Sequence, residues 1–405
     1  MTPPTFAEAT RVWARIGCLS FGGPAAQIAM LHLEAVERRQ WISERRFLEA
    51  LSVCTLLPGP EAQQLATYLG WLLHGVRGGL VAGLLFVLPG AVVMMALSVL
   101  YVSYGAVPAV AALFFGLKCA VLVLVADALR RVAKRALTTR AAYAIAALSF
   151  IALFAFGVPF PAVVLAAGLL GFAMRPSGEA IPAASDASRS GLTARVAGLV
   201  AVVAWVVPPV ALVLAHGGVL ADVGVFFAKL AVVTFGGAYA VLAYAAQDAV
   251  QVHHWLTPGQ MLDGLGLAET TPGPLILVLQ FVGFLAGYGA GGLPTAIAAS
   301  LLTLWVTFAP CFAMVFLIAP SVERVLRMRA LASALAAITA AVVGVIANLA
   351  AWFGWHLLFP AGPDVAALLL VVAAGVALLR FRVGVIPVLL GCAAAALGLH
   401  LVRVR

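Results

Sequence analysis

The sequence predicts an all-α polytopic membrane protein made of two related halves that lie upside down relative to each other. Of the 405 residues, 64% are hydrophobic and only 10% are charged, whereas a soluble domain carries about a quarter charged residues. So little charge cannot cover a water-facing surface, and the apolar runs are long enough for helices rather than barrel strands. One set of motifs also occurs twice, which is typical of transporters built from internal repeats.

Three short motifs carry the repeat. FGG, a lone Trp and PGP occur in the first half at Phe21-Gly22-Gly23, Trp41 and Pro58-Gly59-Pro60, and again at Phe235-Gly236-Gly237, Trp255 and Pro272-Gly273-Pro274. The offset is 214 each time, since 235 − 21, 255 − 41 and 272 − 58 are equal. Three matches at one offset, without a gap, indicate two copies of one unit.

Nine apolar segments are candidate membrane spans: 78–101, 107–129, 141–157, 160–174, 196–216, 297–319, 331–351, 364–379 and 384–401. The segments around FGG and PGP are apolar but broken, because Gly relaxes the backbone and Pro removes an N–H donor. We divide the chain into an N-terminal repeat (1–174), a linker (175–195), an extra transmembrane helix (196–216) and a C-terminal repeat (217–405). Thirteen crossings result if every broken element spans, and fewer if these elements are re-entrant hairpins.

The arginines predict the orientation of each half. The loop 37–46 has four arginines and its counterpart 251–260 has none. Further along, the offset between the copies becomes 221, because Pro310 matches Pro89 and 310 − 89 is 221. At that offset Arg324, Arg327 and Arg329 correspond to the uncharged segment 103–108. By the positive-inside rule the halves are inverted. The unmatched segment 196–216 supplies the odd crossing, so we expect a cytoplasmic N-terminus and linker and a periplasmic C-terminus.

The breaks in the apolar segments predict a substrate site. A helix that begins in mid-membrane has unpaired N–H groups and a partial positive charge at its N-terminus, and such ends bind anions. We expect helix starts at Ala25, near Glu61, at Ala238 and at Leu275. Simple packing kinks are the alternative, because small residues also let helices pack closely.

The candidate substrate-binding residues lie in these breaks or are cations and hydroxyls in apolar surroundings. Lys229 corresponds to Arg15, at an offset of 229 − 15 = 214, and Lys118 lies deep in an apolar segment; intramembrane cations often serve function, although snorkelling to an interface is the alternative. The full set is Ser20, Phe21, Gly22, Gly23, Pro58, Gly59, Pro60, Gln63, Gln64, Lys118, Lys229, Thr234, Gly236, Gly237, Thr271 and Gly273.

Three acidic residues that the second copy does not match are candidates for proton coupling: Glu61, Asp127 and Glu269. For Glu61 the alternative is a stabiliser of a first helical turn. For Asp127 it is an ion pair with Arg130 or Arg131, one turn away. The five cysteines are scattered and no histidine cluster has metal spacing, so we expect no metal and no cofactor.

The order FGG, Trp-Ile/Leu-Ser/Thr and PGP, at fixed spacing and in both halves, resembles the chromate ion transporter family in its long, two-domain form. This resemblance implies a bacterial inner-membrane carrier that exports chromate, is driven by the proton gradient and confers chromate resistance. Its partners would be chromate, protons and the lipid bilayer, with sulfate as a competitor, and not nucleic acid; a homodimer stays open. A sulfate or oxyanion uptake carrier and a passive anion channel are the alternatives. An enzyme is disfavoured, since the sequence has neither HExxH nor GxSxG.

Overall fold

The computed structural model describes residues 4–174, 191–233, 238–321, 329–360 and 362–404, and within these ranges every regular element is helical. The first half contains α1 (Phe6–Leu19), α2 (Gly23–His32), η1 (Leu33–Arg38), α3 (Glu44–Leu56), α4 (Glu61–Tyr104), α5 (Pro108–Ala136), α6 (Arg140–Phe156) and α7 (Phe160–Ala173). The second contains α8 (Gly191–Leu214), α9 (Val219–Val233), α10 (Ala238–Gln247), η2 (Asp248–Val252), α11 (Pro258–Thr270), η3 (Leu275–Leu277), α12 (Val278–Ile318), η4 (Ala319–Ser321), α14 (Arg329–Leu358), α15 (Val365–Gly375), η5 (Val376–Arg380) and α16 (Val385–Val404). The predicted all-α class is confirmed.

The longest helices have the length and composition of membrane spans. In the described part of the chain, six segments are long and apolar enough to cross a bilayer: Glu61–Tyr104, Pro108–Ala136, Gly191–Leu214, Leu275–Ile318, Ala332–Leu358 and Val385–Val402. Large apolar side chains cover the outside of the bundle, as at Leu169 and Leu148, which are 71% and 65% exposed. A surface of this kind suits lipid rather than water. The protein is therefore a polytopic membrane protein.

The helices next to the repeated motifs are much shorter. α1, α2, α3, α9, α10 and α11 have 14, 10, 13, 15, 10 and 13 residues, whereas a single crossing takes about 20. None of them crosses a bilayer alone. The lengths therefore suit the re-entrant alternative better than thirteen complete crossings.

Two long helices fold back on themselves at matched places. α4 loses helical geometry at His74 and Gly75, and α12 does so at Gly291 and Gly292. The two arms of α4 then pack so closely that a Cβ on Gly70 would collide with the carbonyl of Gly78. The segments Glu61–Tyr104 and Leu275–Ile318 each have 44 residues. Each is thus a short arm that follows PGP, a sharp turn and a long arm.

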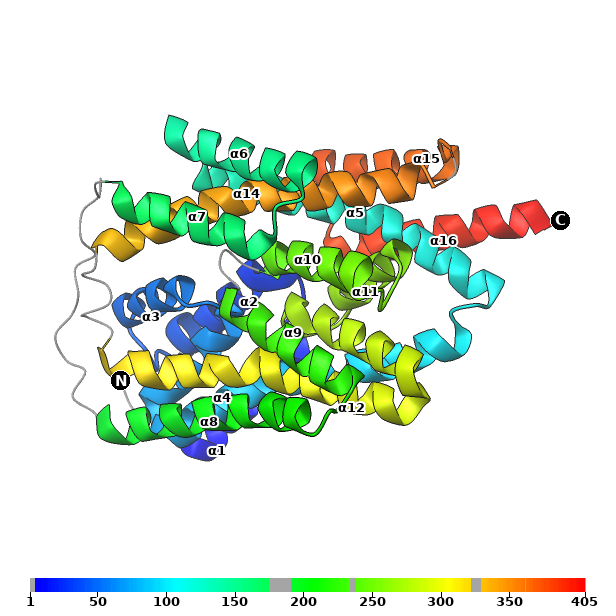
Figure 1. Cartoon of the computed structure of the whole chain (residues 1–405). Coiled ribbons are helices and arrows are strands. Elements are labelled where there is room, and N and C mark those ends of the chain that lie inside the picture. The colour runs from blue at the N-terminus through cyan, green and yellow to red at the C-terminus, as the bar shows by residue number, and fades with distance from the viewer. Residues whose placement is uncertain (1–3, 175–190, 234–237, 322–328, 361, 405) are drawn as a thin grey trace.

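The halves are tied together by exchanged hairpins. α6 and α7 of the first half pack on α14 of the second, and α15 and α16 of the second pack on α5 of the first. Figure 1 shows α6 and α7 toward one end of the bundle, and α15 and α16 toward the other end, where the C-terminus lies. The N- and C-termini lie at opposite ends of the bundle (Figure 1). The long helices α4 and α12 also contact each other, as do α5 and α14, so the core is shared by both halves.

Candidate functional site

Helices follow the repeated motifs. α2 begins at Gly23 rather than at the predicted Ala25, and α4 and η3 begin at Glu61 and Leu275 as predicted. The predicted start at Ala238 adjoins residues 234–237, which lie outside the described residues. Glycines supply the left-handed backbone at the three described breaks, with φ of +89° at Gly22, +121° at Gly59 and +93° at Gly273. Only glycine adopts such angles readily, which explains why each break contains one.

These helix starts and Ala238 of α10 surround one small cavity of about 50 Å³. A cavity of this size holds a few water molecules or a small ion. The first N–H groups of each helix have no partner within their own helix, so they face this region with a partial positive charge. The lining residues are Pro24 and Gln27 from α2, Pro60, Glu61 and Ala62 at the start of α4, Ala238 from α10, and Pro274, Leu275 and Ile276 at η3.

The first FGG break is bonded directly to the second PGP break. The N–H of Gly273 donates to the carbonyl of Ser20 over 2.8 Å, and the Nε2 of Gln27 donates to the carbonyl of Gly273 over 2.6 Å. The Oε1 of Gln27 is buried without a hydrogen-bond partner among the described residues. The cavity is therefore formed by both halves, and Gln27 brings a free amide oxygen to it.

Sequence reasoning missed Gln27. The residue at the offset of 214 is Val241, so a search for matched letters passes over this position. The available signal was its place four residues after Gly23, one turn into a helix that begins in apolar surroundings. At that spacing a side chain points back toward the helix start.

Two of the predicted hydroxyl ligands are turned into their own helices. The Oγ of Ser20 donates to the carbonyl of Ile16 over 2.5 Å, and the Oγ1 of Thr271 donates to the carbonyl of Leu267 over 2.8 Å. Both residues are buried beside the breaks. Ser20 nevertheless takes part in the junction through its backbone carbonyl.

Of the two predicted glutamines, Gln64 contacts the first PGP break and Gln63 bonds within its own helix. The Nε2 of Gln64 donates to the carbonyl of Pro58 over 2.7 Å, and the Nε2 of Gln63 donates to Thr67 over 3.2 Å. The Oε1 atoms of both glutamines are buried without a partner in the described chain. A Cβ on Gly59 would lie 2.7 Å from the Nε2 of Gln64. The break is thus tightly packed, with Gln63 and Gln64 outside the residues that line the cavity.

The structure places Lys118 away from the cavity. Its Nζ lies 3.3 Å from the Oδ1 of Asp263, and the hydroxyl of Tyr101 donates to the other oxygen of this carboxylate over 2.9 Å. Asp263 is only 4% exposed. Lys118 therefore neutralises a buried carboxylate, and its predicted role as an anion ligand has no geometric support.

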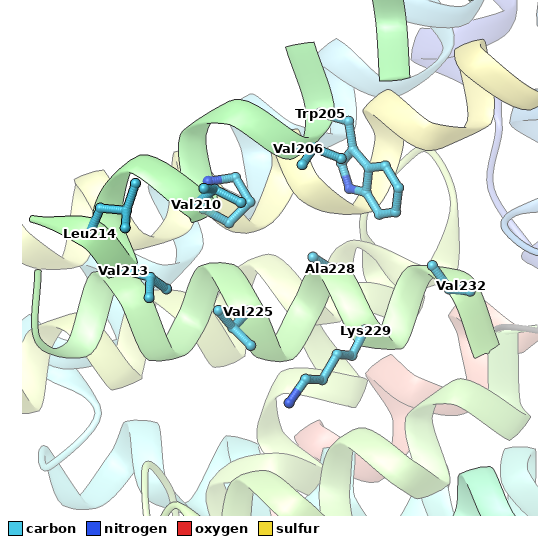
Figure 2. A pocket seen from close by; sticks show the side chains of 10 residues that line it. Trp205, Val206, Val210, Val213, Leu214, Val225, Ala228, Lys229 and Val232 are labelled. Carbon is cyan, nitrogen blue, oxygen red and sulfur yellow. The ribbon is translucent and has the colours of Figure 1, made fainter. Parts of the chain in front are cut away.

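Lys229 also lies outside the junction cavity. It lines two others, an apolar groove of about 380 Å³ between α8 and α9 and a more polar cavity of about 440 Å³ that reaches η2. Figure 2 shows its side chain leaving α9 on the side away from Trp205, Val210 and the other α8 residues of the groove. Thr234, Gly236 and Gly237, which were predicted as ligands on the following segment, lie outside the described residues.

The three acidic candidates have different surroundings. Glu61 lines the junction cavity. The Oε1 of Glu269, which is 8% exposed, accepts from the hydroxyl of Tyr239 over 2.6 Å. Asp127 is held by Arg130 at 2.9 Å and by Arg131 at 3.0 Å, so the ion pair that was the alternative for Asp127 is confirmed.

Comparison with known proteins gives one consistent relationship. The chromate transporter family matches residues 7–172 and 221–399, which leaves out the linker and α8. The chain is 36% identical over 351 residues to the chromate transport protein of Pseudomonas aeruginosa, covering 85% of this chain and 80% of that protein. It is 29% identical over 350 residues to the chromate transport protein of Cupriavidus metallidurans, covering 85% of this chain and 82% of that protein. No solved structure matches.

Both matched segments begin before an FGG motif and extend past the PGP motif that follows it, so each includes the breaks that form the cavity. Together they cover most of the chain. The protein belongs to the chromate transporter family.

Proposed function

We propose that this protein exports chromate across the bacterial inner membrane at the expense of the proton motive force, and so confers chromate resistance. The observation that supports the proposal is one cavity lined by residues at the starts of α2, α4 and η3 together with Ala238 of α10, so that both halves contribute to it. The names of the related chromate transport proteins support the choice of substrate.

The chemistry of the cavity suits a tetrahedral dianion. Helix N-termini offer several N–H donors without a full positive charge, and they bind oxyanions such as sulfate and phosphate. Neither lysine candidate lines the cavity. A carrier must release what it binds, and partial charges hold a dianion less firmly than a lysine would. Chromate and sulfate have the same shape and charge, so both are expected to enter.

The membrane potential favours export of such an ion. Moving one elementary charge through 100 mV is worth about 2.3 kcal/mol, and roughly twice that for a dianion. The interior of a bacterium is negative, so the outward direction is downhill electrically. Alternating access would follow if one inverted half rocks against the other around the shared cavity. Both halves contribute the contacts that would break and re-form, among them Gln27 to Gly273.

Glu61 is the residue through which protons are expected to act on the cavity. An ionised carboxylate at the lining repels a dianion, and a protonated one does not. Occupancy of the cavity and protonation of Glu61 therefore influence each other reciprocally. Asp127 and Glu269 remain candidates for later steps in proton transfer.

Inverted vesicles test the proposal, because export then appears as accumulation of labelled chromate. We expect uptake that a protonophore abolishes but that an imposed pH gradient still drives when valinomycin and potassium hold the membrane potential at zero, and we expect competition by sulfate. Gly59→Ala and Gly273→Ala should reduce uptake tenfold or more, since a misplaced binding group costs about that much or more. Gly289→Ala is the control, because nothing lies within 4 Å of its added Cβ. Glu61→Gln should flatten the pH dependence of the apparent chromate affinity.

Each alternative gives a different result in the same vesicles. With the membrane potential held at zero, a passive channel would equilibrate chromate without accumulating it, even when a pH gradient is imposed. A sulfate uptake carrier would accumulate substrate in right-side-out vesicles instead. Equal uptake by wild type and both break variants would contradict the assignment of the cavity.

A further inference from the structure

The first half contains a cluster of paired charges that joins the first turn of α1 to η1 and the residue after it. The Nη1 of Arg39 lies 3.3 Å from a carboxylate oxygen of Glu8, and its Nε lies 3.3 Å from Glu34. The guanidinium also sits over the ring of Trp41, 5.2 Å from its centroid. Burial raises the pKa of Glu34, but hydrogen bonds from Arg38 and Arg39 outweigh it and leave the pKa below its usual value. We call Glu8, Glu34 and Arg39 the Arg39 cluster.

The second half has the matching positions with one change of chemistry. At the offset of 214, Glu8 corresponds to Asp222, Glu34 to Asp248 and Arg39 to His253, since 222 − 8, 248 − 34 and 253 − 39 are equal. The ring of His253 stacks on Trp255 with centroids 4.3 Å apart, as Arg39 lies on the matched Trp41. The acids and the aromatic support are kept, and histidine stands where the first half has arginine.

The two clusters differ in their contacts. Within the described chain, His253 makes no ion pair with Asp222 or Asp248, and a cavity of about 440 Å³ is lined by all three residues. The other polar groups that line this cavity are Lys229 from α9, Tyr244 from α10 and His216 from the connection between α8 and α9. The second cluster is thus the open counterpart of a closed one.

Protonation is the property that distinguishes the two central residues. Arginine stays charged at all relevant pH values, whereas histidine changes its charge between about pH 5 and 8. Burial raises the pKa of Asp248, and the hydroxyl of Tyr244 and the charge of His253 oppose that rise. A proton on His253 would therefore be attracted by two carboxylates. Within the described residues no printed distance pairs a lysine or arginine with Asp222 or Asp248, and Lys229 lines the same cavity.

We propose that the cavity between α9, α10 and η2 is a proton-binding site in which protonated His253 binds Asp222 and Asp248 and closes this end of the second half. The Arg39 cluster shows the closed geometry that the protonated site adopts. Closure and protonation stabilise each other, so lower pH favours the closed state and higher pH favours the open state. This inference deepens the proposed function, because it gives the proton a defined place in the cycle.

Thiol labelling measures the opening of the cavity without any transport. Ala221, which lines the cavity, is changed to Cys in a Cys18→Ser background, because Cys18 is exposed. A membrane-impermeant maleimide is then applied at a series of pH values. The same construction with His253→Gln corrects for the intrinsic pH dependence of the thiol reaction. Relative to His253→Gln, we expect labelling to fall at least fivefold between about pH 8 and pH 5.5.

Three further variants sharpen the result. His253→Arg should keep labelling low at every pH, and Asp222→Asn should remove most of the pH response. His254→Gln is the matched control, since its ring contacts only the carbonyl of Val250 and the residue is exposed. It should respond to pH like the wild type. If the wild type and His253→Gln are labelled alike at every pH, the proposal is wrong, whether or not the vesicles accumulate chromate.

Discussion

At the scale of residues, the clearest revision concerns Lys118. Its position deep in an apolar segment predicts a functional cation, and the structure finds its partner in Asp263 on α11. The hydroxyl of Tyr101 donates to the other oxygen of that carboxylate. Spacing along the chain gives no means of pairing residues that are 145 positions apart, the difference between 263 and 118.

The pair predicts a specific pattern of stability. Lys118→Met leaves Asp263 buried without its counterion, which typically costs about 3–5 kcal/mol. The Lys118→Met/Asp263→Asn double variant should recover most of this loss, since it buries no unpaired charge. Thermal unfolding of the purified protein in detergent measures both, with Lys134→Met, exposed on the same helix, as control. Loss of chromate binding in the double variant at full stability would instead restore Lys118 as a ligand.

At the scale of elements, the sequence predicts where helices begin better than where they turn. Of the three starts whose preceding residues are described, FGG and PGP locate two to the residue and the third to within two. A search for matched residues at the offset of 214 does not find the turns inside α4 and α12, because Gly75 and Gly292 are 217 residues apart (292 − 75). They also lie in continuous apolar sequence, where hydropathy alone cannot separate one long helix from two arms.

These turns predict a matched pair of weak points. Gly75 has φ +63° and ψ −153°, and Gly292 has φ +68° and ψ −159°. Such angles belong almost only to glycine, and another residue there costs about 1–3 kcal/mol. Gly75→Ala and Gly292→Ala should each lower the unfolding temperature by a similar amount. Gly289→Ala, with open space around its Cβ and no positive φ, should leave it unchanged; two unaffected turn variants would refute the fold-back geometry.

At the scale of the whole molecule, the inversion that the arginines predict has a testable consequence for sidedness. The termini lie at opposite ends of the bundle (Figure 1). The distribution of arginines predicts that the N-terminus is on the cytoplasmic side. Because the C-terminus is then periplasmic, alkaline phosphatase fused after Arg405 should be active. Green fluorescent protein fused at the same place should not fluoresce. The same reporters after residue 190, in the linker, should behave in the opposite way. Matching signals from the two positions would mean an even number of crossings between them.

The exchange of hairpins has a consequence for biosynthesis. α7 ends at Ala173 and α14, on which it packs, begins at Arg329, so 155 residues (328 − 173) separate the hairpin from its partner. At about 5–20 residues per second, the ribosome needs roughly 10–30 s to supply them. Throughout that interval the nascent α6–α7 hairpin has only lipid, or a membrane chaperone, to cover the face that α14 will occupy. The first half is therefore synthesised well before α14 is available to complete its packing.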